Sequence, residues 1–168
     1  MAANSRIDDL RRRVELDPAS IAFAQLAEEY RRVGQFRDAV TTCRAGLTIH
    51  PTYLSARVTL GRSLLALEQL DEADTELGAV LATAPDNLAA MRARAEVYRL
   101  QGRRAEAVAC YSAALRLAPN DPDLERMMHD LSTAPTPPDP AQARATATVA
   151  TLERWLEAID AARADRDA

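Results

Sequence analysis

Two histidines and two cysteines are the side chains of this sequence most able to take part in catalysis or to bind a metal ion. His50 directly precedes a proline and His129 lies in a predicted helix. Neither stands near a cysteine, serine or carboxylate in a recognisable catalytic arrangement. Cys43 and Cys110 are 67 positions apart, in no metal-ligand spacing. We therefore predict no catalytic residue, no metal site and no cofactor, and we expect that the protein is not an enzyme.

Adjacent carboxylates offer no better candidate for catalysis. Glu28 and Glu29, like Asp71 and Glu72, lie on predicted helices, where consecutive side chains point in diverging directions. The sequence also has no glycine-rich phosphate loop and no His-x-x-x-His or Cys-x-x-Cys pair. The sequence therefore indicates a binding function rather than catalysis. Its composition and periodicity predict the helices that would form the binding surface.

The composition favours close-packed helices over a sheet. Hydrophobic residues fill 48% of the 168 positions and aromatic residues only 4%, so alanine and leucine must make up the core. The net charge is −4, an acidic balance that argues against nucleic acid as a partner, and all 21 basic residues are arginine. No apolar run approaches the roughly 18 residues of a membrane span, and the first residues lack the apolar stretch of a signal peptide. We expect a cytoplasmic protein without a membrane span.

Three prolines, Pro51, Pro85 and Pro119, are spaced 34 residues apart, and each ends a pair of predicted helices. The units that they delimit are residues 20–53, 54–87 and 88–121. Small and large apolar residues recur at matching positions of the units: Phe23, Leu26, Ala27, Tyr30, Ala39, Cys43 and Gly46; Leu60, Gly61, Leu64, Ala73, Leu77 and Val80; Met91, Ala95, Tyr98, Ala107, Tyr111 and Ala114. A fixed period of this length indicates an array of helical hairpins.

These residues resemble the tetratricopeptide repeat family over residues 20–121. The family pattern places small side chains where the two helices of a repeat face each other, so that their axes can approach, and large side chains beside them. The sequence departs from the pattern at Arg57, at Glu68, where the other units have glycine, and at Arg94. A charge at Arg94 needs a partner, so we expect its stem to pack and its guanidinium to reach an edge of the stack. A weakened or tilted third repeat is the alternative.

The resemblance implies an all-α, right-handed solenoid of three helix hairpins. We expect residues 1–19 and 122–131 to form capping helices, because the open ends of an array would otherwise expose apolar surface. Residues 132–140 contain four prolines and predict a stiff linker. Residues 141–168 are predicted to form a separate amphipathic tail helix.

The resemblance also implies the position of a ligand. The concave surface of the family is lined by the first helix of each repeat, and these residues of the chain are predicted to form a peptide-binding groove there: Ala24, Glu28, Arg31, Val58, Arg62, Leu65, Arg92, Glu96 and Arg99. Some members hold the terminal carboxylate of chaperone peptides with Lys and Asn at the positions of Ala24 and Glu28, so the sequence argues against a chaperone-tail adaptor. The groove instead suits an amphipathic helix or an extended peptide with some acidic side chains.

We predict a non-catalytic adaptor or scaffold whose partners are proteins bound in this groove, and two alternatives remain open. A chaperone of secretion or assembly type would bind a protein substrate. A self-regulating homo-oligomer would use the tail helix as a plug or an exchanged element. The apolar stripe predicted to form the interface of that helix is Val149, Leu152, Trp155, Leu156 and Ile159. It could dock on its own array, on a second copy or on an unrelated protein.

Overall fold

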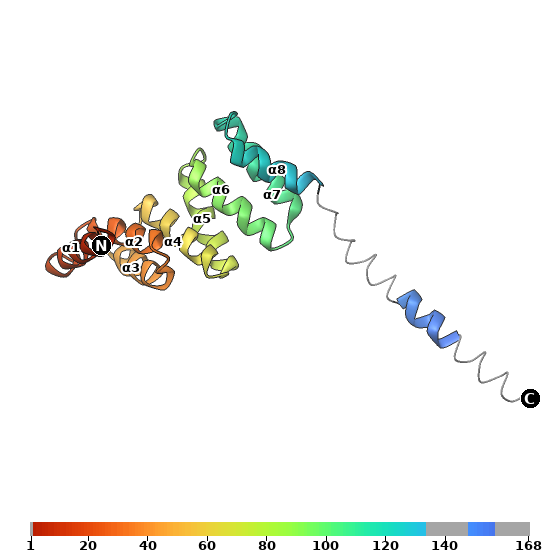
Figure 1. Cartoon of the computed structure of the whole chain (residues 1–168), viewed down its shortest axis with the longest axis horizontal. Coiled ribbons are helices and arrows are strands. Elements are labelled where there is room, and N and C mark those ends of the chain that lie inside the picture. The colour runs from red at the N-terminus through yellow and green to blue at the C-terminus, as the bar shows by residue number, and fades with distance from the viewer. Residues whose placement is uncertain (1, 134–147, 157–168) are drawn as a thin grey trace, which may run out of the picture. The chain divides into compact units, whose positions relative to one another are not determined.

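The computed structural model describes residues 2–133 and 148–156 of the chain (Figure 1). Every regular element in these residues is helical, and residues 148–156 form the last of them. The others are α1 (Ala2–Leu16), α2 (Ala22–Arg32), α3 (Phe36–Ile49), α4 (Leu54–Ala66), α5 (Leu70–Thr83), α6 (Leu88–Leu100), α7 (Arg104–Leu117) and α8 (Pro122–Thr133). The prediction of an all-α fold is confirmed for these residues. The chain divides into two units, Met1–Ser132 and Thr133–Ala168, which are described separately.

The first unit is a stack of helical hairpins (Figure 1). Helix α2 pairs with α3, α4 with α5, and α6 with α7, and each hairpin packs on the next through α3 with α4 and α5 with α6. The first helices of the hairpins also pack on one another, α2 with α4 and α4 with α6. These three helices therefore form one continuous surface, on which the predicted groove residues lie.

The turn inside each hairpin requires a residue with a positive φ angle. Gly34 has a φ of 81° and Gly102 a φ of 73°, values that glycine adopts without steric cost. Glu68 occupies the same place in the middle hairpin with a φ of 58°. The departure from the repeat pattern at this position therefore keeps the shape of the turn, at the expense of strain in the backbone.

The turn between hairpins is fixed by the three prolines. The residues before them, His50, Ala84 and Ala118, have ψ angles of 68°, 83° and 74°, outside the helical range. A proline disfavours helical angles in the residue that precedes it, so α3, α5 and α7 each end at this point. The 34-residue spacing of the prolines thus sets the length of every repeat.

Small side chains let the helices of each hairpin approach. Ala27, Ala39, Ala73, Ala95 and Ala107 are completely buried, at the positions where the two helices face each other. Large side chains such as those of Phe23, Leu64, Leu77 and Tyr111 fill the space beside them and are at most 1% exposed. In a core packed this closely, the addition of a single methyl group is enough to disturb the packing.

The ends of the stack are covered by α1 and α8. Ile7 and Leu10 of α1 are buried against the first hairpin. Leu124 and Leu131 of α8 are buried in one cluster with Tyr111 of α7. Helix α8 reaches Thr133, the last described residue before the gap, two residues beyond the predicted boundary at residue 131. Residues 134–140 of the linker and 141–147 and 157–168 of the predicted tail helix lie outside the described residues.

The two arginines that depart from the repeat pattern both have partners. Arg94 Nε is 2.6 Å from Asp74 Oδ1 on the preceding hairpin, and its guanidinium carbon lies 5.1 Å from the ring centroid of Tyr98. Arg57 Nη1 is 2.7 Å from Glu76 Oε2. Each charge is therefore compensated across a helix interface, and α6 and α7 of the third hairpin are both complete.

Candidate functional site

His50 and Cys43, two of the four residues considered for catalysis, pack against other parts of the fold. The Nε2 atom of His50 lies 2.6 Å from the carbonyl oxygen of Ala19, and its ring stacks on Phe23 with 5.9 Å between the centroids. Burial raises the pKa of the Cys43 thiol to about 12, which keeps it protonated and unreactive at neutral pH. Among the described residues, no group of three or more His, Cys, Asp or Glu side chains could hold a metal ion, and no helix is long and apolar enough to cross a membrane. The cytoplasmic location stays a prediction.

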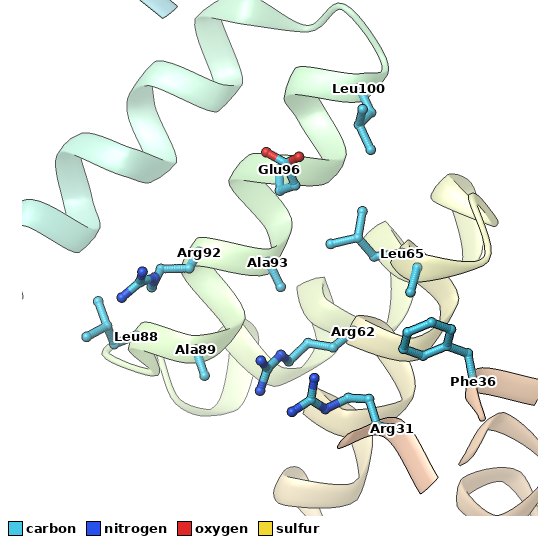
Figure 2. A pocket seen from close by; sticks show the side chains of 11 residues that line it. Arg31, Phe36, Arg62, Leu65, Leu88, Ala89, Arg92, Ala93, Glu96 and Leu100 are labelled. Atoms are coloured by element: carbon cyan, nitrogen blue, oxygen red, sulfur yellow. The ribbon is translucent and has the colours of Figure 1, made fainter. Parts of the chain in front are cut away.

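Two adjoining cavities lie on the surface formed by α2, α4 and α6. The larger has a volume of about 840 Å³ and is shown in Figure 2. It is lined by Arg31, Phe36, Arg62, Leu65, Ala66, Leu88, Ala89, Arg92, Ala93, Glu96 and Leu100. The smaller has a volume of about 480 Å³ and is lined by Arg6, Ala24, Gln25, Glu28, Glu29, Arg32, Tyr53, Ser55, Val58, Thr59, Arg62, Asn87 and Ala89. Both cavities share Arg62 and Ala89, and together they are called the α2–α4–α6 groove below.

All but one of the predicted groove residues line these cavities. Arg31, Arg62, Leu65, Arg92 and Glu96 line the larger one, and Ala24, Glu28, Val58 and again Arg62 line the smaller one. Arg99 lines neither: its side chain is 44% exposed on α6, where it forms an ion pair with Glu96.

The sequence prediction did not include every residue of the groove. Phe36 is the first residue of α3 and reaches the larger cavity from outside the first helices, beside Leu65 (Figure 2). Tyr53 and Asn87 line the smaller cavity from the turns between hairpins. The prediction used only positions on the first helix of each repeat, so it could not identify residues that reach the groove from other elements. A large apolar side chain directly after the hairpin turn was the available signal for Phe36.

Most of the positive charge in the groove is compensated by neighbouring carboxylates. Glu28 accepts two hydrogen bonds from Arg31, of 2.7 and 2.9 Å, and a third of 3.2 Å from the Thr59 hydroxyl. The bonds from Arg31 are the main reason why the pKa of Glu28 lies below its usual value. The same arrangement recurs two repeats later, where Arg99 donates two hydrogen bonds, of 2.6 and 2.8 Å, to Glu96.

Arg92 is compensated by carboxylates at and just beyond the end of the third repeat. Its Nη1 atom is 2.7 Å from Asp121 Oδ2, in the turn before α8, and its Nη2 atom is 3.8 Å from Asp123. The sequence analysis predicted a ligand with some acidic side chains from residues of the first helices alone. Asp121 and Asp123 lie outside these helices and neutralise one of their arginines.

Arg62 differs from the other arginines of the groove. It is half-buried, and no ion pair or hydrogen bond joins it to another residue in the part of the chain that the structure describes. The guanidinium groups of Arg31 and Arg62 lie side by side (Figure 2). Burial, followed by repulsion from Arg31, lowers the pKa of Arg62. The uncompensated charge of the groove is thus concentrated on one side chain at the junction of the two cavities.

A family model described as tetratricopeptide repeat matches residues 58–122. These residues cover the second and third hairpins, whose turns, buried alanines and proline spacing are described above. Residues 58–122 are thus tetratricopeptide repeats. The solved structures that resemble the chain have the same fold, so the predicted solenoid is confirmed.

One relative and two solved structures illustrate this similarity. The protein is 34% identical over 86 residues to the uncharacterized protein y4yS of Sinorhizobium fredii, an alignment of 51% of this chain and 47% of y4yS. It thus spans about half the length of that relative. MamA of Desulfovibrio magneticus RS-1 superposes with a TM-score of 0.72 at 19% identity, over 77% of this chain and 73% of MamA. The first repeat domain of RPAP3, bound to the HSP90 peptide SRMEEVD, superposes with a TM-score of 0.65 at 16% identity, over 68% and 91% of the two chains.

The α2–α4–α6 groove is suited to binding. It combines apolar side chains, among them Leu65, Leu100 and Phe36, with a cation, Arg62, that has no ion-pair partner among the described residues. Such a surface can bury an apolar side chain and neutralise one negative charge at the same time.

Proposed function

We propose that the protein is a non-catalytic adaptor that holds a segment of a partner protein in the α2–α4–α6 groove. The observation that carries the proposal is the cavity of about 840 Å³ at Arg62, which joins apolar lining to an unpaired guanidinium. Ligand sites in proteins typically have volumes of roughly 300–1,000 Å³ and combine these two features. A segment of about one helical turn or a short extended strand would fit such a groove.

The fold of the protein supports a peptide as the ligand. RPAP3, whose first repeat domain has the same fold, binds the acidic HSP90 peptide SRMEEVD. This chain has Ala24 and Glu28 at the places where the carboxylate clamp of chaperone-binding relatives would stand. We therefore expect a different peptide, held mainly between α4 and α6. A chaperone of secretion or assembly type would use the same groove and would differ in the identity of its ligand.

The proposal can be tested by blocking the groove. Ala89 is exposed, is the second residue of α6 and lines both cavities. An Ala89→Tyr substitution should obstruct the groove without disturbing the core. Ala105→Tyr is the matched control, because Ala105 is exposed, is the second residue of α7 and lines neither cavity.

The measurement is selection of short random peptides by the immobilised full-length protein, followed by affinity measurement in solution. The wild type and Ala105→Tyr should bind the selected peptides with equal affinity, and Ala89→Tyr should bind them at least about tenfold more weakly. Equal binding by all three proteins would show that the peptides do not bind in the α2–α4–α6 groove, provided that circular dichroism shows each variant to be folded.

A second candidate function rests on the second unit. Within residues 148–156, Val149, Leu152, Trp155 and Leu156 are 52%, 55%, 68% and 59% exposed. Ile159, the last residue of the predicted stripe, lies outside the described residues. An exposed apolar helix face of this kind is typical of an interaction site. We propose that it binds a protein surface, with a second copy of the chain as the simplest partner.

A further inference from the structure

Arg62 occupies the junction of the two cavities of the groove, since it lines both of them. A peptide that occupies both cavities therefore passes Arg62 rather than ending at it. The apolar side chains of Leu65 and Leu100 lie in the larger cavity, and Val58 and Tyr53 line the smaller one. Apolar contacts are thus available on both sides of the single free cation.

The ligand group that suits Arg62 follows from the charges around it. Arg31 and Arg92 already hold carboxylates of the chain, at 2.7 Å in each case. Glu28 and Glu96 also line the groove, so a second negative charge on a ligand would meet carboxylates rather than free cations. One unpaired guanidinium between compensated ones therefore matches a single carboxylate better than a dianionic phosphate.

We propose that Arg62 binds the side-chain carboxylate of an Asp or Glu inside the partner segment, with a large apolar residue of that segment entering the cavity beside Leu65. This inference rests on the proposed function and names the chemistry of its ligand. The recognised group is an internal side chain, because the groove continues on both sides of Arg62. Arg62 belongs to the middle repeat, whereas Ala24 and Glu28 belong to the first repeat and line the smaller cavity with it.

The test compares two charge reversals of equal size in the full-length protein. Arg62→Glu reverses the charge at the junction. Arg116→Glu is the control, because Arg116 is an exposed residue of α7 that lines neither cavity. Peptides are selected from a random library on the wild-type protein, and those that Ala89→Tyr fails to bind are kept as groove-dependent.

We expect the groove-dependent peptides to share one internal Asp or Glu next to large apolar residues. Replacing that residue by its amide should weaken binding to the wild type and to Arg116→Glu about tenfold. The same replacement should leave the already weak binding to Arg62→Glu unchanged, because the interacting pair is then absent. Amidation of the peptide C-terminus should have no effect.

Three results would overturn the inference while leaving the proposed function intact. They are groove-dependent peptides without a shared acid, tighter binding when phosphoserine replaces that acid, and loss of binding on amidation of the C-terminus. The last two would identify a phosphate site and a terminal-carboxylate site, respectively. Failure to select any peptide sensitive to Ala89→Tyr would overturn both the inference and the proposed function.

Discussion

Arg62 gives up part of its hydration without receiving an ion pair from the described residues of the chain. A charge in this situation does not stabilise the fold, and side chains kept for binding often have this property. The neighbouring Arg31, by contrast, contributes to the fold, since it donates two hydrogen bonds to Glu28. The two neighbouring arginines should therefore respond differently to removal of their charge.

We expect Arg62→Gln to change the free energy of unfolding by no more than about 0.5 kcal/mol, in either direction. Arg31→Gln should lower it by about 1 kcal/mol, because Glu28 then loses its main partner in a partly buried place. Urea denaturation of both variants and the wild type measures the difference. A larger loss for Arg62→Gln than for Arg31→Gln would mean that Arg62 has a structural role.

Glu68 offers a second prediction at this scale, because its φ of 58° is costly for a residue with a side chain. Glu68→Gly should raise the free energy of unfolding by about 0.5–1 kcal/mol through relief of that strain. Gly34→Ala should lower it by a similar amount, since no atom lies within 4 Å of the added methyl group and only its φ of 81° opposes it. Thermal melts compare the stability of each variant with that of the wild type. A Glu68→Gly variant less stable than the wild type would contradict backbone strain at Glu68.

The sequence allowed prediction of which residues face the groove but not of how they pair. Position within a repeat determines the direction of a side chain, and so eight of the nine predicted residues line the cavities. Pairing depends on residues outside the pattern: Asp121 compensates Arg92 from the turn before α8, and Asp74 compensates Arg94 from the hairpin before. These separations of 29 and 20 positions carry no signal in a single sequence.

At the scale of elements, the approach of α4 to α5 depends on the absence of a side chain at Gly61. A methyl group added there would lie 2.6 Å from Leu77 Cγ, inside the packed core of the middle hairpin. Gly78 on α5 is a matched position, because an added methyl group would meet only the end of the Arg94 side chain, at 3.3 Å. The first glycine is required for packing and the second is not.

Gly61→Ala should therefore lower the free energy of unfolding by about 1–3 kcal/mol through overpacking. Gly78→Ala should leave it unchanged or raise it by up to about 1 kcal/mol, because alanine favours a helix and the arginine tip can move. Urea denaturation of the two variants and the wild type measures these changes. Equal stability of the two variants would show that α4 and α5 can move apart without a loss in the free energy of unfolding.

The ends of the elements were predictable where a single residue type determines them. The prolines predicted the ends of α3, α5 and α7 because they constrain the preceding residue directly. The boundary of α8 was predicted at residue 131, but the helix reaches Thr133, where the described residues of this segment stop. Phe36 was missed because its place in the groove depends on how the first hairpin packs on α4, a tertiary property.

At the scale of the whole molecule, the exposed face of residues 148–156 predicts self-association. We expect the full-length chain to show a mass that rises with concentration in sedimentation equilibrium, because a second copy can cover that face. Trp155→Ala should reduce the association, and Arg154→Ala, on the same exposed helix, should not. A single monomer mass for the wild type at all concentrations would contradict this prediction and exclude a homo-oligomer.

The measurement that tests the central claim most directly is chemical-shift mapping on the ¹⁵N-labelled full-length protein during titration with a selected peptide. We predict that the amides of Leu65, Ala89 and Ala93 shift together with one dissociation constant, and that the side-chain signal of Arg62 shifts with them. Exposed residues that lie outside both cavities, such as Ala79 on α5 and Ala109 on α7, should stay unchanged. Shifts on α5 and α7 with an unperturbed α2–α4–α6 groove would contradict the account.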